Sequence, residues 1–267
     1  MRFATLCLIL CLAVLMMAAG WSWQRRHQNA GIVDVLWSAG LGASALLSAA
    51  LGAGSLAPRL LVGVCGGLWG LRLALHLWAR VRHESEDGRY GALRDRWVGN
   101  QRKFFALFQF QAVLVALFAM PFVIAAGNPG TRPSWLGAGV LIFCVSVGGE
   151  SLADAQLARF RADPANRGLT CRMGLWRYSR HPNYFFEWLH WFAYVAFAVG
   201  APQGWLALAG PLLMYVFLRY VSGIPYTEAQ ALRSRGENYR DYQRRTSMLF
   251  PRPPRRVYPS SPSDKAS

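Results

Sequence analysis

The chain has 267 residues, of which 54% are hydrophobic and 16% charged, and its formal net charge is +16. The apolar content lies above, and the charged content below, the usual values of soluble domains, which argues against a water-soluble globule. A basic chain can bind nucleic acid through its phosphates, but here nearly all Lys and Arg residues lie in the segments that connect or follow apolar runs, which argues against that partner.

Seven apolar segments succeed one another along the chain, near residues 3–23, 31–52, 58–81, 104–126, 135–154, 184–200 and 203–221. Unbroken apolar runs of about 20 residues cross a bilayer as helices, and they are too apolar for the alternating strands of a barrel. The sequence therefore predicts an all-α polytopic membrane bundle of about seven transmembrane helices, with the lipid bilayer as its surroundings.

The basic residues predict how this bundle is oriented. Nearly all of them fall in four segments, residues 24–30, 80–103, 155–180 and 219–267. With seven spans, an amino terminus outside and a cytoplasmic carboxy terminus place all four segments on the cytoplasmic side, as the positive-inside rule requires. Because the chain carries no organellar targeting signal, a bacterial inner membrane is the expected location.

The domain organisation is expected to be simple. Residues 1–250 are predicted to form one membrane domain, and the Pro-, Ser- and Arg-rich residues 251–267 are predicted to form a disordered tail. A cleaved signal peptide is disfavoured because no small-residue cleavage site precedes the segment 21–26 and another span follows it. The five cysteines form no CxxC pair, so neither a disulfide framework nor a metal site is predicted.

Ionisable side chains inside the predicted spans require an explanation, because burying them in lipid is costly. The set is Asp34, Arg72, His76, Glu150, Asp154 and Glu187. Asp34 and Arg72 fit either a structural ion pair between neighbouring helices or a polar cavity open to the cytoplasm. Glu150 and Asp154 share one helical face. They fit either a solvated helix end or a pair that holds ribose hydroxyls or fixes nearby arginines.

The densest group of polar side chains lies in residues 174–190, GLWRYSRHPNYFFEWLH. Pro182 suits the first turn of a helix, so the sixth span is predicted to begin there with its amide groups able to receive an anion. Asn183, Glu187 and His190 share one face of that helix. A further basic and aromatic group, residues 226–245, is interpreted as a solvated helix or an anionic-lipid contact.

These residues carry a resemblance to a known family. The stretch GLWRYSRHPNYFFEW at 174–188, Gly-Ile-Pro at 223–225 and GENYRDYQRRTS at 236–247 resemble the steroid 5-alpha-reductase family, in particular its bacterial members. The segments VDVLW at 33–37 and EDGRY at 86–90 resemble the same bacterial branch. The resemblance implies a seven-helix membrane reductase that uses NADPH to reduce a carbon-carbon double bond conjugated to a ketone.

The resemblance also implies where the cofactor binds, in the half of the chain from about residue 140 to 250. Asp154, Tyr178, Asn183 and Glu187 match the nucleotide-contacting positions of the family, and Glu150 stands where an amide is usual. Arg159 and Arg180 are added as phosphate ligands. His181 and Tyr184 from the same cluster complete the expected NADPH site, in which arginines suit phosphates and carboxylates suit ribose hydroxyls.

For the chemistry, the resemblance implies a membrane carboxylate and a tyrosine at the substrate carbonyl. Asp34 falls about where the carboxylate is expected. Trp69 stands in the tyrosine's place and has no phenolic proton to donate, so the missing proton donor is expected to be Tyr90 or His76. The expected substrate is an apolar, steroid-like or isoprenoid lipid, although Trp69 counts against a ketosteroid.

Two other interpretations remain open at this stage. The Arg-His-Pro-x-Tyr stretch and the tyrosine pair near the end are also similar to isoprenylcysteine carboxyl methyltransferases, which use S-adenosylmethionine. The excess of arginine, together with Asn183 and Glu187, favours a phosphate-rich cofactor instead. A non-enzymatic protein whose basic face contacts anionic lipids would not require the Tyr, Asn, His and Glu side chains gathered at one helix start.

Overall fold

A computed structural model describes residues 2–255, which form helices and turns without any strand, so the predicted all-α fold is confirmed. The helices of the first part are α1 (Arg2–His27), α2 (Ile32–Leu51), α3 (Leu56–His83), α4 (Gly88–Trp97) and α5 (Gln101–Ala126). The others are α6 (Pro133–Ala162), α7 (Pro182–Phe197), α8 (Ala209–Val216), α9 (Ile224–Arg235) and α10 (Glu237–Arg245). Of the expected disordered tail, residues 256–267 lie outside the described residues.

Short turns of other helix types connect some of these elements. They are the 3-10 turns η1 (Pro164–Asn166), η2 (Gly174–Arg177) and η3 (Gly204–Leu208), and the π-helical turn η4 (Phe217–Val221). Because η3, α8, η4, α9 and α10 follow one another closely, the chain from 204 to 245 is one nearly continuous helical run.

Six helical segments within residues 2–255 are long and apolar enough to cross a membrane: α1, α2, α3, α5, α6 and the run 204–245. The segment predicted as the sixth span forms α7, which has 16 residues and is shorter than a full crossing needs. Large apolar side chains such as Leu8, Leu15 and Leu141 are exposed on these helices, as expected where lipid replaces water. The chain is therefore an integral multi-pass membrane protein.

Contacts divide the chain into two compact units. The first unit comprises residues 1–143 and 190–214, and the second comprises residues 144–189 and 215–267. Helices α6 and α7 each contribute to both units.

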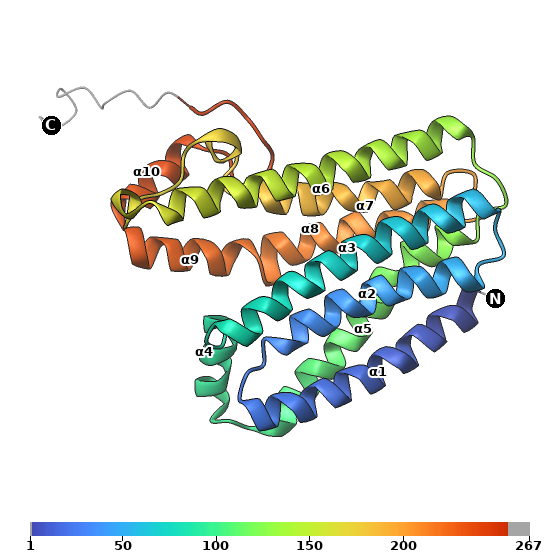
Figure 1. Cartoon of the computed structure of the whole chain (residues 1–267), viewed down its shortest axis with the longest axis horizontal. Helices are drawn as coiled ribbons and strands as arrows, with labels where there is room; N and C mark the ends of the chain where they lie inside the picture. Colours follow the sequence, from blue (N-terminus) through green and yellow to red (C-terminus); the bar gives the residue numbers. More distant parts are fainter. Residues whose placement is uncertain (1, 256–267) are drawn as a thin grey trace, which may run out of the picture. The chain divides into compact units, whose positions relative to one another are not determined.

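In the first unit, α1, α2, α3 and α5 run alongside one another in alternating directions, and the short α4 lies where α1 and α3 end (Figure 1). Glycines let α2 and α3 approach closely. A Cβ on Gly70 would lie 2.6 Å from the Cα of Gly42, so the two backbones touch at this point. Both Arg25 on α1 and Arg80 on α3 lie in the last turns of their helices, which brings basic groups to the α4 end.

The second unit has a small core where α9 and α10 pack against each other. Ala231, Tyr239 and Tyr242 are buried there. The Tyr242 hydroxyl donates to the backbone oxygens of Trp176 and Ser179, so α10 is fixed to the turn that precedes α7.

Candidate functional site

The segment EDGRY, residues 86–90, attaches α4 to the start of α2. Glu86 accepts hydrogen bonds from the backbone nitrogen of Ala30, at 2.7 Å, and from the guanidinium of Arg94. Asp87 caps α4 by accepting from the backbone nitrogen of Arg89. The contacts of Glu86 and Asp87 thus fix the position of this segment. The last residue of the segment, Tyr90, contacts α2.

Asp34 and Tyr90, two of the residues predicted for catalysis, lie in direct contact. The Tyr90 hydroxyl donates to the Oδ1 atom of Asp34 at 2.7 Å, and Arg89 contacts the Oδ2 atom at 3.2 Å. The basic partner of Asp34 is therefore Arg89 of α4, and not Arg72, which was one of the two interpretations that the sequence left open. Asp34 also lies in the first turn of α2, where the helix dipole favours a negative charge.

Tyr90 of α4 and the capping residue Asp87 have shifted pKa values. Burial raises the pKa of Tyr90 well above its usual value, and the nearby negative charge of Asp34 raises it further. Burial also tends to raise the pKa of Asp87, but hydrogen bonds from Arg89 and its positive charge outweigh burial and lower that pKa overall. At neutral pH, Tyr90 is thus a protonated hydrogen-bond donor beside a fixed charge pair.

A small polar pocket of about 30 Å³ adjoins this pair. Its charged lining side chains come from α2, from α3, from the loop between α3 and α4, and from α4. They are Asp34, Arg80, Glu84, Asp87 and Arg89. A pocket of this volume has room for about one water molecule, and its polar walls satisfy a water better than an apolar group.

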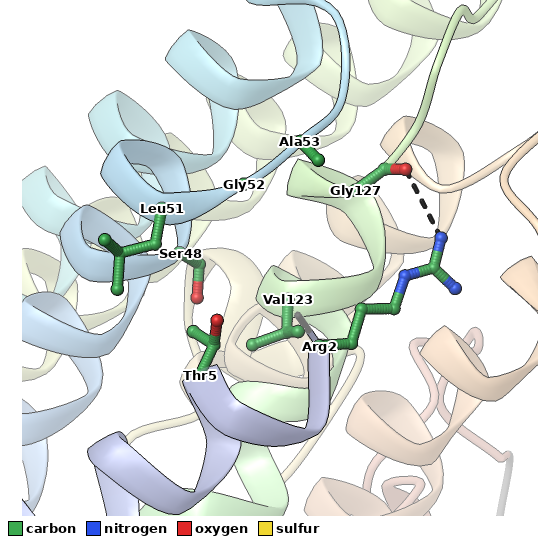
Figure 2. Close-up of a pocket in the computed structure, with 8 residues that line it drawn as sticks. All are labelled: Arg2, Thr5, Ser48, Leu51, Gly52, Ala53, Val123 and Gly127. Carbon is green, nitrogen blue, oxygen red and sulfur yellow. Dashed lines mark hydrogen bonds between the residues drawn. The ribbon is translucent and has the colours of Figure 1, made fainter.

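A larger cavity, of about 240 Å³, lies at the opposite end of the first unit (Figure 2). In that view the hydroxyls of Thr5 and Ser48 face each other, and the guanidinium of Arg2 reaches the backbone oxygen of Gly127 at 3.3 Å. No residue predicted for catalysis or cofactor binding lines this cavity. Its size therefore does not identify it as the reaction site, and the chemistry-bearing side chains point to the smaller pocket.

His76, the other candidate proton donor, is exposed on α3 and does not line the pocket beside Asp34. Trp69, which occupies the place of the expected tyrosine, is buried and packs its ring on His190 with 4.7 Å between ring centroids. The structure therefore brings Tyr90, and not His76, to the predicted carboxylate.

In the second unit, the turn before α7 is held by α6. Gly174 has a φ of +56°, and a Cβ there would lie 2.4 Å from the side chain of Gln156, so only glycine fits. Gln156 accepts a hydrogen bond from the backbone of Leu175, and the Trp176 indole donates to the Ala153 carbonyl at 2.9 Å. These contacts fix where Tyr178 and the start of α7 stand.

The carboxylate of Glu228 on α9 is the centre of a hydrogen-bond network behind that turn. It accepts from Arg180 at 2.7 Å, from His181 at 3.2 Å and from Gln243 at 2.9 Å. Arg180 also donates to the carbonyl oxygens of Gln243 and Thr246. Arg180 and His181, both predicted to contact the cofactor, thus have their hydrogen bonds inside the protein.

Burial affects the acidity of His181 in this network. Its side chain is buried and stacks on the ring of Tyr184. Burial lowers the pKa of His181 below its usual value, although the hydrogen bond and charge of Glu228 partly oppose this. His181 is therefore neutral at physiological pH and acts as a packed structural group.

The remaining predicted cofactor residues lie along facing turns of α6 and α7. The Asn183 amide donates to the Oδ1 atom of Asp154 at 3.2 Å. A Cβ on Gly149 would touch the ring of Phe186, which shows that the two helices are antiparallel with Asp154 and Asn183 in register. One turn further on, Glu150 and Glu187 are buried on the same two helices.

Other residues that were predicted to contact the cofactor are accessible to a dissolved molecule. Tyr178 is 43% exposed, and Arg159 and Asp154 are exposed on α6. Tyr184 is half-buried, and its hydroxyl lies 3.3 Å from the Thr227 hydroxyl of α9. The accessible set therefore combines a cation, a carboxylate, an amide and an aromatic ring.

Sequence reasoning did not identify Arg89 and Glu228 as partners of the predicted site residues. Each forms an ion pair with a residue of opposite charge: Arg89 with Asp34, and Glu228 with Arg180. Glu228 carried a usable signal, since it is the one acidic residue in the stretch 219–235, which also contains Arg219, Arg233 and Arg235. Arg89 carried less, because it is one basic residue among many near the cytoplasmic ends.

Fold and site together define a class of protein: a polytopic helical membrane protein with buried acidic and aromatic side chains near its basic helix ends. Residues 20–246 match the model of the family described as protein of unknown function DUF1295, and the chain belongs to that family. An uncharacterized protein of Schizosaccharomyces pombe is 28% identical over 214 residues, covering 69% of this chain and 61% of the relative. This chain thus spans less than two thirds of the length of that relative. No solved structure matches this chain.

Proposed function

We propose that the chain is an NADPH-dependent membrane reductase of a carbon-carbon double bond conjugated to a ketone in an apolar lipid. The observation that carries the proposal is the contact of Tyr90 with Asp34, 2.7 Å long and buried beside a polar pocket. A carboxylate and a phenol in contact form an acid that can supply the one proton consumed by such a reduction. A bacterial inner membrane is the proposed location.

The accessible residues of the second unit fit a nucleotide with phosphates. Arg159 is exposed and suits a phosphate, whereas the carboxylate of Asp154 suits ribose hydroxyls. Asn183 offers an amide beside that carboxylate, and Tyr178 offers an exposed ring for stacking. Bound NADPH would supply the hydride. Arg180 and His181 have a structural role in this site, because their side chains form hydrogen bonds with Glu228 of α9.

The roles of the first-unit residues follow from their contacts. Asp34 holds the Tyr90 hydroxyl in place by accepting its hydrogen bond. During the reaction this hydroxyl turns from Asp34 to the substrate and gives up its one proton there. Arg89 holds the Asp34 carboxylate in place and balances its charge. The hydride adds to the β-carbon of the enone and the proton to its α-carbon, so the product is the saturated ketone.

The proposal is tested with the purified full-length protein in detergent, NADPH and an apolar isoprenoid enone such as β-ionone. NADPH oxidation that depends on the enone and yields the saturated ketone is the expected result. Asp34→Asn is expected to bind NADPH with unchanged affinity and to lose turnover. Turnover by this variant at the wild-type rate would restrict Asp34 to a structural ion pair with Arg89.

A further inference from the structure

The last described residues, 247–255, form a strap that runs back over the turn preceding α7. At the start of the strap, the backbone nitrogen of Arg180 donates to the Ser247 oxygen at 2.8 Å. Further along, the backbone nitrogen of Arg252 donates to the Tyr178 oxygen at 2.9 Å. The strap is thus bonded at two points to the turn that carries predicted cofactor residues, and all of these residues belong to the second unit.

Side chains also hold the strap in place. Leu249 is 1% exposed, and its backbone oxygen accepts a hydrogen bond from the Ser179 hydroxyl at 2.8 Å. The ring of Phe250 meets the ring of Trp188 edge to face, with 5.3 Å between the ring centroids. These contacts fix the position of the strap residues that follow.

The strap brings a positively charged residue to the exposed ring of Tyr178. Arg252 is bonded to Tyr178 through its backbone, and Arg252 itself is exposed. Arg177, which precedes Tyr178 in the chain, is exposed too. Neither arginine forms an ion pair within residues 2–255. Two cations that no described carboxylate neutralises therefore lie next to one accessible aromatic residue.

Prolines stiffen the strap on both sides of Arg252. Pro251 precedes this arginine and Pro253 follows it. A proline fixes its own φ and restricts the residue before it to extended conformations, so the backbone of Arg252 has little freedom to lose. Binding a ligand through Arg252 therefore costs less conformational entropy than binding it through a free chain end.

The chemistry of this surface favours a phosphate attached to a nucleoside. A guanidinium binds phosphate through paired, charge-assisted hydrogen bonds, and an accessible tyrosine ring can stack on a purine. An uncharged lipid would satisfy neither Arg177 nor Arg252. An anionic lipid headgroup would satisfy both arginines but would leave Tyr178 without a ring to stack on.

We propose that Arg252 is a cofactor-binding residue, which the strap delivers to the 2′-phosphate of NADPH beside an adenine stacked on Tyr178. This assignment rests on the proposed reductase function. Because NADH lacks the 2′-phosphate, Arg252 makes the site prefer NADPH to NADH. Leu249 and Phe250 are positioning residues, since they hold the strap and do not touch the cofactor.

The test measures the dissociation constants of NADPH and NADH for the full-length protein in detergent, by isothermal titration calorimetry. Arg252→Gln is expected to bind NADPH about tenfold more weakly, as the loss of charge-assisted hydrogen bonds predicts. The same variant should bind NADH as the wild type does, which also shows that its site is folded. Arg233→Gln removes an exposed positive charge from α9 and is the control, with unchanged affinity for both nucleotides.

Delivery by the strap is tested with Phe250. Phe250→Ala removes the ring contact with Trp188 and should weaken NADPH binding without changing the affinity for NADH. The double variant of Phe250→Ala and Arg252→Gln should bind NADPH no more weakly than Arg252→Gln alone, because both changes remove the same interaction. Phe250→Trp keeps an aromatic ring and is expected to retain the preference for NADPH. Additive losses in the double variant would show that the strap does not position Arg252.

The possible failures are distinguishable. If the wild type binds NADPH and Arg252→Gln binds it equally well, or if this variant loses affinity for NADPH and NADH alike, the role of Arg252 is wrong and the reductase stands. If Arg252→Gln instead lowers binding to phosphatidylglycerol vesicles and leaves NADPH binding unchanged, the strap contacts the membrane. A wild-type protein that binds neither nucleotide would refute the reductase, and the assignment of Arg252 with it.

Discussion

The Tyr90 hydroxyl donates to the Asp34 carboxylate across 56 residues of chain, because Glu86 binds the backbone just before α2 and Asp87 caps the start of α4. The pair is thus a product of the loop that follows α3 and not of either helix alone. Changes in that loop are therefore expected to act on catalysis.

Tyr90→Phe is expected to remove the proton donor and leave the fold intact. Since general acid catalysis contributes about 10²- to 10⁴-fold, turnover of an enone should fall by roughly 10²-fold or more, with NADPH affinity unchanged. Steady-state kinetics on the purified variant measure this. Tyr220→Phe, which changes a tyrosine that is 62% exposed, is the matched control. Equal turnover in both variants would remove Tyr90 from the mechanism.

Glu228→Gln is expected to destabilise the second unit. The change leaves the guanidinium of Arg180, whose side chain is 11% exposed, without its ionic partner, and it weakens the hydrogen bond from His181. A loss of roughly 2 to 3 kcal/mol follows from breaking a largely buried pair. Thermal unfolding in detergent measures it. Glu237→Gln removes an exposed carboxylate from the same helical region and should leave the midpoint unchanged.

Stability is expected to depend on pH through His181. Its pKa in the folded protein is lowered by burial, whereas the unfolded value is about 6.5. The neutral ring therefore contributes its full stability above pH 6.5, and that stability is lost as the pH falls from 6.5 toward the folded pKa. Unfolding midpoints at pH 7.5 and 5.5 should differ more in the wild-type protein than in His181→Gln. Parallel pH profiles would contradict the buried neutral histidine.

Gly70→Ala is expected to separate α2 from α3. The added Cβ would lie 2.6 Å from the backbone of Gly42, so the helices must shift, at a cost of about 1 to 3 kcal/mol. Gly148→Ala, where nothing lies within 4 Å of the added Cβ, is the control and should be neutral or stabilising. A variant Gly70→Ala as stable as Gly148→Ala would show that this seam is not closely packed.

Much of the fold followed from hydrophobicity alone, because a bilayer allows few structures for runs of about 20 apolar residues. The start of α7 at Pro182 was also predictable from the fixed φ of proline. The length of α7 was not, since apolar residues continue past Phe197 into a turn in which Gly200 has a φ of +89°. Local apolar content does not mark such an end.

The candidate site was only partly predictable for a different reason. Helical spacing places residues such as Asp154 on a face but does not say which side chain of another helix meets them. The sequence offers Arg72 as one partner of Asp34, whereas the structure pairs Asp34 with Arg89. The sequence likewise does not indicate that Arg180 pairs with Glu228. Partners joined by long loops are set by tertiary packing, which one sequence does not encode in its periodicity.

The most direct test of the central claim is the identity of the cofactor, measured by thermal-shift titration of NADPH and of S-adenosylmethionine against the wild-type protein and Asn183→Ala. The account predicts that NADPH raises the unfolding temperature of the wild type, that Asn183→Ala loses this stabilisation while keeping its own fold, and that S-adenosylmethionine has no effect. Stabilisation by S-adenosylmethionine and not by NADPH would contradict the reductase and favour methyl transfer.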